Sequence, residues 1–149
     1  MPLVTVAPLS SLLVQTLDLG EHISDANQRD LVFVAELRQG ETLIATQAVP
    51  LVPTKHLALR DPAVAATVSA ADGGLGIDLQ AQSLARLVEL AFDGSDTVFS
   101  DNYFDLPAGR TIRVSCLLPA GWTVEQARAA LKIRSIYDSF AHPTKEGPQ

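Results

Sequence analysis

The amino-acid sequence predicts an all-β protein: an immunoglobulin-like β-sandwich with extra N-terminal strands from a preceding sandwich domain. Its apolar residues alternate with polar ones at a period of about two rather than 3.6, which is typical of half-buried strands. These runs are short and recur about every 8–12 residues, with glycine, proline and aspartate between them. The chain has 149 residues, of which 47% are apolar and 19% charged, so it can bury a core and is not disordered as a whole.

The N-terminal third contains a hairpin signal. Residues 31–37 and 42–48 are two strand-like runs joined by Gln39-Gly40-Glu41, a short turn with a glycine. The apolar run at residues 12–17 predicts a further strand. We count about four strands in residues 1–48, which are too few to close a sandwich alone.

Two prolines indicate a domain boundary. Pro50 and Pro53 stop strand growth, because proline has no N–H to donate to a ladder. We therefore expect residues 1–52 to be trailing strands of a preceding sandwich domain and residues 53–61 to be a linker. The C-terminal immunoglobulin-like sandwich then occupies residues 62–141, and residues 142–149 form a flexible tail.

The predicted sandwich contains six or seven strands and one short helix. The helix begins after Thr123, because Thr123 and Gln126 have the spacing of a capping box. Cys116 alternates with Val114 in a strand, so we expect it to be a small buried apolar residue. The expected strands are residues 64–68, 76–81, 87–92, 98–99, 103–106, 111–117 and 131–136.

Composition excludes several functional classes. The net charge of −6 and the absence of a Lys/Arg run argue against a nucleic-acid partner. A single cysteine excludes an internal disulfide framework. No apolar stretch reaches the ~20 residues of a membrane helix, and no Lys or Arg precedes Arg29 to form the positive region of a signal peptide. We expect a cytoplasmic protein without membrane contact.

The sequence offers no strong catalytic or metal-binding pattern. Aspartates cluster between residues 93 and 105, but without EF-hand spacing, so we interpret them as turn-stabilising residues. The three histidines, His22, His56 and His142, lie far apart in the sequence. We therefore expect no metal and no cofactor. A few aromatic residues could stack on sugars, although core packing is the alternative for Trp122. These aromatic residues are Tyr103, Phe104, Trp122, Tyr137 and Phe140.

One stretch resembles a known family. Residues 98–106 (VFSDNYFDL), followed by Pro107-Ala108-Gly109, are similar to the F-S-D-N-Y-F-x-L-x-P-G signature in the last domain of glycoside hydrolase family 2 β-mannosidases. Further segments resemble the same family in the same order; they are residues 6–11, 30–48, 53–57, 61–62, 83–90 and 131–138. Related exo-β-glucosaminidases carry a similar signature, so the substrate does not follow from it.

The resemblance implies a non-catalytic part of such an enzyme. In the family the catalytic acid/base glutamate follows an asparagine and lies, with the nucleophile, in a (β/α)₈ barrel. No glutamate of this chain follows an asparagine, and a barrel takes about 250 residues. We therefore expect no catalytic residue here, and a C-terminal accessory fragment whose partner is the catalytic domain of the parent glycosidase. A carbohydrate-binding module is the alternative.

The candidate domain-docking or sugar-contact site consists of four residues of the signature and one further aromatic residue. They are Asp101, Asn102, Tyr103 and Phe104, together with Trp122. Asp and Asn accept hydrogen bonds from nearby N–H groups and tolerate left-handed backbone, which predicts a sharp corner at residues 100–102. This corner either closes the sandwich or contacts the catalytic domain or a sugar. Strands without partners also predict a homodimer through exposed edges.

Overall fold

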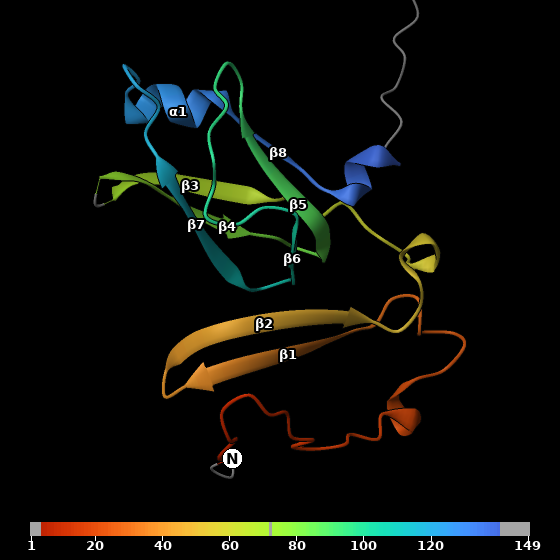
Figure 1. Ribbon diagram of the computed structural model, residues 1–149. Helices are drawn as coiled ribbons and strands as arrows, with labels where there is room; N and C mark the ends of the chain where they lie inside the picture. Colours follow the sequence, from red (N-terminus) through yellow and green to blue (C-terminus); the bar gives the residue numbers. More distant parts are fainter. Residues whose placement is uncertain (1–3, 72, 141–149) are drawn as a thin grey trace, which may run out of the picture.

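The computed structural model describes residues 4–71 and 73–140 as a β-sandwich with a separate β-hairpin below it (Figure 1). The hairpin consists of β1 (Val32–Gln39) and β2 (Thr42–Pro50). The sandwich contains β3 (Ala65–Ala71), β4 (Gly74–Gln80), β5 (Ala85–Phe92), β6 (Phe104–Leu106), β7 (Thr111–Leu117), α1 (Val124–Ala130) and β8 (Leu131–Arg134). Short 3₁₀ turns are η1 (Gly20–His22), η2 (Thr54–His56) and η3 (Ile136–Ser139). The predicted all-β, immunoglobulin-like class is confirmed.

Two antiparallel sheets of three strands enclose the core. One sheet has the order β3-β4-β7 and the other β6-β5-β8. Alternate side chains of each strand point inward, so Ile77 and Val114 of the first sheet, both fully buried, meet Val88 and Leu106 of the second. The sandwich is therefore held together by aliphatic side chains from both inner faces.

The predicted helix and its cap are confirmed. The hydroxyl of Thr123 accepts a hydrogen bond from the N–H of Gln126, and the amide oxygen of Gln126 accepts one from the N–H of Thr123. This capping box pairs two backbone donors that the first helical turn leaves free. Ala127 is fully buried against the core, because a methyl side chain lets the helix approach the sheets closely.

The N-terminal part departs from the sequence prediction. The hairpin is confirmed, with Gly40 in the left-handed region at φ +57°. Instead of about four strands, however, the described residues up to 52 contain only β1 and β2. Residues 12–17 form no strand, since they make no backbone hydrogen bond to another segment of the described chain. The predicted tail at residues 142–149 lies outside the described residues.

Two smaller departures have local causes. Residues 98–99 form no strand, and only Phe99 makes an isolated bridge, to Cys116. The last strand ends at Arg134 rather than at residue 136, because Asp138 accepts hydrogen bonds from the N–H and hydroxyl of Ser135 and turns the chain into η3. Cys116 is buried as predicted, and burial raises the pKa of its thiol.

Within the described ranges, no helix has the length and apolar character that crossing a membrane requires.

The core predicts a clear contrast between two leucines. Leu79 is fully buried, whereas Leu117 is 75% exposed. We expect Leu79→Ala to lower the free energy of unfolding by about 3 kcal/mol through lost burial and the cavity left behind. Leu117→Ala, the matched control, should change it by less than about 0.5 kcal/mol. Urea denaturation checks both; equal losses would contradict this description of the core.

Candidate functional site

Residues 100–104 form a corner in which the chain passes from one sheet to the other. At its start, the N–H of Ser100 donates to the carbonyl of Ser115 on β7 (2.7 Å), and the Ser100 hydroxyl accepts from the N–H of Ser115 (2.9 Å). At its end, Asn102 binds Leu90 on β5. The corner is therefore hydrogen-bonded to both sheets.

The side chain of Asn102 takes the place of a strand backbone. Its Oδ1 accepts from the N–H of Leu90 (2.7 Å), and its Nδ2 donates to the carbonyl of the same residue (3.0 Å). The backbone of a neighbouring strand would form the same two hydrogen bonds with the N–H and carbonyl of Leu90. The carboxylate of Asp101 accepts the N–H of Asn102 (2.8 Å), so the predicted turn-stabilising role of these two residues is confirmed.

The left-handed backbone lies elsewhere than predicted. It occurs at Tyr103, with φ +62°, and not at Asp101 or Asn102. A bulky residue rarely adopts this conformation, and here the N–H of Tyr103 is held by the carbonyl of Val88 (2.7 Å). The corner thus places the strained, left-handed backbone at an aromatic residue rather than at an Asp or Asn, which would tolerate it.

A second strained residue lies next to it in β5. Leu87 has φ +50° and sits in a β-bulge, where Arg86 and Leu87 oppose the single residue Asp105 of β6. The carboxylate of Asp105 accepts the N–H of Leu87 (3.1 Å) and forms an ion pair with Arg86 (3.1 Å). Asp105 thereby accepts the hydrogen bond of the Leu87 N–H, which the bulge leaves without a partner on the neighbouring strand.

Both strained side chains point away from the core. Tyr103 is 61% exposed and Leu87 is 45% exposed, whereas the adjacent Val88 is fully buried. The hydroxyl of Tyr103 donates to Glu89 (3.1 Å), and the Glu89 carboxylate raises the pKa of this phenol by hydrogen bonding and by its charge. We call Leu87, Glu89, Tyr103 and Arg134, which border one cleft, the Tyr103 face.

Two clefts adjoin the Tyr103 face. One, of about 460 Å³, extends from Leu87 and Tyr103 to η3. The other, of about 630 Å³, lies between β2 and the sandwich and is lined by three predicted site residues, Asp101, Tyr103 and Phe104. Trp122 lines neither cleft; its ring is centred 5.8 Å from that of Phe92, against the core. The structure thus brings the corner residues together and separates Trp122 from them.

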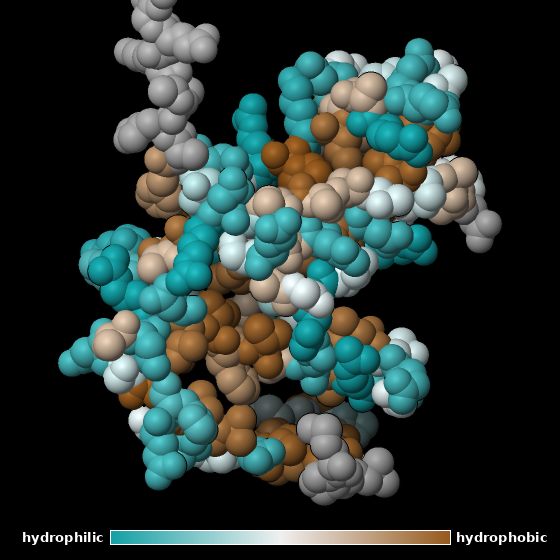
Figure 2. Space-filling model, turned by 180° about the vertical axis from the view of Figure 1, so that it is seen from behind, coloured by the Kyte–Doolittle hydropathy of each residue, from teal (hydrophilic) through white to brown (hydrophobic). Residues whose placement is uncertain are grey.

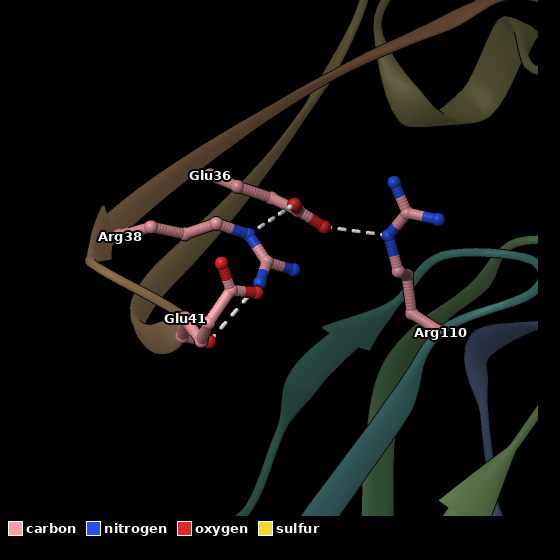
Figure 3. A network of polar contacts seen from close by, with 4 residues as sticks. All are labelled: Glu36, Arg38, Glu41 and Arg110. Carbon is pink, nitrogen blue, oxygen red and sulfur yellow. Dashed lines mark hydrogen bonds and ion pairs between the residues drawn. The ribbon is translucent and has the colours of Figure 1, made fainter.

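An ion-pair network that the sequence did not reveal joins the hairpin to the sandwich (Figure 3). The carboxylate of Glu36 on β1 accepts hydrogen bonds from Arg110, before β7, and from Arg38 (3.1 Å). The hydrogen bonds and positive charges of these two arginines lower the pKa of Glu36. Glu36 and Arg110 are 74 residues apart, so no local pattern relates them.

The connector is fixed to the sandwich by a second arginine. Arg86, which pairs with Asp105, also donates to the hydroxyl of Thr54 in η2 (2.8 Å). Ser83 donates to the carbonyls of Arg60 and Asp61. The connector is therefore bound to the sandwich at several points. Across the described ranges, no group of three or more His, Cys, Asp and Glu side chains is arranged to hold a metal ion.

Comparisons with known proteins agree with the signature at residues 98–106. Residues 59–139 match the Ig_mannosidase model, an Ig-fold domain, and residues 3–56 match a Mannosidase Ig/CBM-like domain. The β-D-mannosidase from Dictyoglomus thermophilum has a similar fold, with a TM-score of 0.62 and 17% identity over 70% of this chain and 13% of that chain. No curated protein matches. The expected resemblance to an Ig-like accessory part of a β-mannosidase is confirmed.

The Asn102 hydrogen bonds predict a measurable loss of stability. Asn102→Ala leaves the N–H and carbonyl of Leu90 without partners beside the core, so we expect the free energy of unfolding to fall by about 2–3 kcal/mol. Asn27→Ala is the control, since Asn27 also makes two hydrogen bonds to the backbone, but in an exposed turn. Urea denaturation that gave equal losses would contradict the role of Asn102.

The Glu36 network predicts that acid loosens the hairpin. The folded-state pKa of Glu36 lies below the ordinary 4.5, so its ionised form stabilises the folded arrangement above that pH. The contribution is lost as the pH falls through the lowered pKa. NMR signals of β1 and β2 should broaden or shift in that range, and Glu36→Gln should show the altered signals already at neutral pH. A variant with wild-type signals at neutral pH would contradict this.

Proposed function

The chain belongs to the Ig-fold domain family of mannosidases over residues 59–139, and from this membership we propose that it serves as a non-catalytic C-terminal accessory region of a glycoside hydrolase family 2 β-mannosidase. The match to residues 59–139 is the observation that carries the proposal. The signature at residues 98–106 lies within this match. We retain the division into residues 1–52, 53–61, 62–141 and 142–149 as part of the same proposal.

We propose that the Tyr103 face and the adjoining corner pack against the catalytic domain of the parent glycosidase. Tyr103 and Leu87 support this, because both are large, exposed and held in left-handed backbone. Such strain persists where surrounding contacts enforce it, and it often occurs at binding surfaces. The hydroxyl of Tyr103 is bonded to Glu89, which limits the ring's freedom before a partner binds.

Carbohydrate binding is the second candidate function. The cleft of about 630 Å³ supports it, because Tyr103 lies there beside the carboxylates of Asp101 and Asp105. An aromatic ring with nearby polar groups suits a pyranose, which offers C–H bonds on its face and hydroxyls on its rim. Trp122 supports this function less, since it packs on Phe92. A related exo-β-glucosaminidase is the alternative parent enzyme.

Homodimerisation through exposed strands is part of the proposal as well. The hairpin is a sheet of only two strands, so each of its strands has one edge without a ladder partner in the described chain.

We expect the chain by itself to release no product from an aryl β-mannoside. The catalytic glutamates of the resembled family lie outside the region matched here, so no nucleophile is available. Calorimetry with manno-oligosaccharides then separates the two candidates: a docking region gives no heat, whereas a sugar-binding region gives saturable heat that Tyr103→Ala abolishes. Turnover of the aryl mannoside would refute the accessory role.

The docking proposal predicts a specific effect of Tyr103. When a β-mannosidase catalytic domain is supplied as a separate polypeptide, we expect Tyr103→Ala to weaken its association with the chain tenfold or more, as typical for a buried aromatic anchor. Val98→Ala is the control, because Val98 is also highly exposed (86%) but lines neither cleft of the Tyr103 face. Biolayer interferometry measures both; equal affinities would exclude this face as the contact.

A further inference from the structure

The β-bulge in β5 turns two consecutive side chains out of the core. Ala85 and Val88 are both fully buried, although they are three residues apart. Side chains of a regular strand alternate between its two faces, so residues three apart would lie on opposite faces. The extra residue of the bulge restores the phase. Arg86 and Leu87 therefore both lie outside the core, and each contacts a different part of the molecule.

Arg86 contacts the connector that precedes the sandwich. Its Nη1 donates to the hydroxyl of Thr54 in η2 (2.8 Å). Thr54 belongs to the region that matches the Mannosidase Ig/CBM-like domain, and Arg86 to the region that matches the Ig-fold domain. The same guanidinium donates from Nε to Oδ1 of Asp105 (3.2 Å), and its Nη2 pairs with Oδ2 (3.1 Å). One side chain thus joins the two matched regions to the bulge.

Asp105 connects this guanidinium to the Tyr103 face. Its Oδ1 also accepts a hydrogen bond from the N–H of Leu87 (3.1 Å). The next residue, Val88, accepts the N–H of Tyr103 with its carbonyl (2.7 Å). Both left-handed residues of the face are therefore held close to the carboxylate that Arg86 binds. Arg86 itself lines neither cleft beside Tyr103, so it acts on the face through Asp105.

The connector is held to the preceding domain as well. The carbonyl of His56 accepts a hydrogen bond from Nε of Arg29 (2.7 Å), and the N–H of Ala58 donates to the carbonyl of Arg29 (2.9 Å). Arg29 stands three residues before β1. Figure 2 shows mostly hydrophilic side chains along the margin where the connector borders the sandwich (left in this view), so the position of the connector depends on its inward contacts.

The contacts of Arg86 are shielded from solvent. The side chains of Arg86 and Asp105 are 16% and 15% exposed. Displacing one partner of a shielded pair leaves the other charge unpaired, which costs more than at an exposed site. The planar guanidinium also holds Asp105 and Thr54 at the same time, whereas a lysine ammonium lacks this rigid fork. A displacement of Thr54 is therefore passed on to Asp105 and the bulge.

We propose that Arg86 is a positioning residue of the Tyr103 face, and that it couples a partner bound at this face to the connector. A partner that packs against Leu87 and Tyr103 fixes the bulge, and through Arg86 it fixes the connector. By linkage, a fixed connector strengthens binding at the face by the same factor. This inference rests on the proposed docking of the Tyr103 face to the catalytic domain, and it adds that docking orients the domain before the connector.

Thr54→Val tests the coupling, because it removes one hydroxyl and leaves the other contacts of the guanidinium in place. We expect the amide NMR signals of Leu87 and Tyr103 to shift in the isolated chain. Affinity for a separately supplied β-mannosidase catalytic domain, measured by biolayer interferometry, should fall by about threefold or more, as the loss of one hydrogen bond predicts. Thr67→Val is the matched control, since Thr67 is an exposed residue of β3 in the opposite sheet; it should change neither.

Hydrogen exchange provides a readout that a merely structural role of Arg86 would not change. The N–H groups of His56 and Leu57 are hydrogen-bonded at η2. Saturating amounts of the catalytic domain should slow their exchange in the wild-type chain and leave it unchanged in Thr54→Val. Arg86→Lys should lose this protection too. Protection that persists in Thr54→Val would show that the partner contacts the connector directly, and it would refute the coupling.

The binding measurement separates failure of docking from failure of the coupling. A wild-type chain that does not bind the catalytic domain would refute the docking proposal. A wild-type chain that binds, with the same affinity as Thr54→Val, would refute the coupling and leave docking intact. Urea denaturation shows that the variant is folded: we expect cooperative unfolding as in the wild-type chain, because Thr54 lies outside the core.

Discussion

A polar corner is hydrogen-bonded to both sheets of the sandwich, and the exposed position of Tyr103 depends on it. Asn102 pairs with the backbone of Leu90 in one sheet, and Ser100 pairs with Ser115 in the other. Because both ends of the corner are fixed, Tyr103 is held in left-handed backbone and its ring stands outside the core. The same few hydrogen bonds therefore stabilise the sandwich and hold the Tyr103 ring at the surface.

Polar contacts of charged side chains attach the connector and the hairpin to the sandwich. Arg86 bonds to Asp105 in the bulge and to Thr54 in the connector, and Arg110 bonds to Glu36 in the hairpin. The Arg110–Glu36 pair is partly exposed and alone contributes little, whereas the Arg86–Asp105 pair is largely shielded from solvent. Together they hold the connector and hairpin against the sandwich.

The strands and the helix were predictable because their signals are local. Strands β5 and β7 follow from alternation, the hairpin from Gly40 between two apolar runs, and α1 from the Thr123–Gln126 spacing. The run at residues 12–17 has the same alternation and forms no strand. A strand needs a neighbour as well as a pattern, since its hydrogen bonds are made to another segment of chain.

Sequence alone determined the all-β class, the short capped helix and a corner at residues 100–102, because periodicity, capping and turn chemistry act within a few residues. Only the tertiary structure decided that Tyr103 and Leu87 share one exposed face, that Trp122 packs inward on Phe92, and that Glu36 meets Arg110. These relations join residues far apart in the chain. They depend on how two sheets and a hairpin pack, which no local pattern encodes.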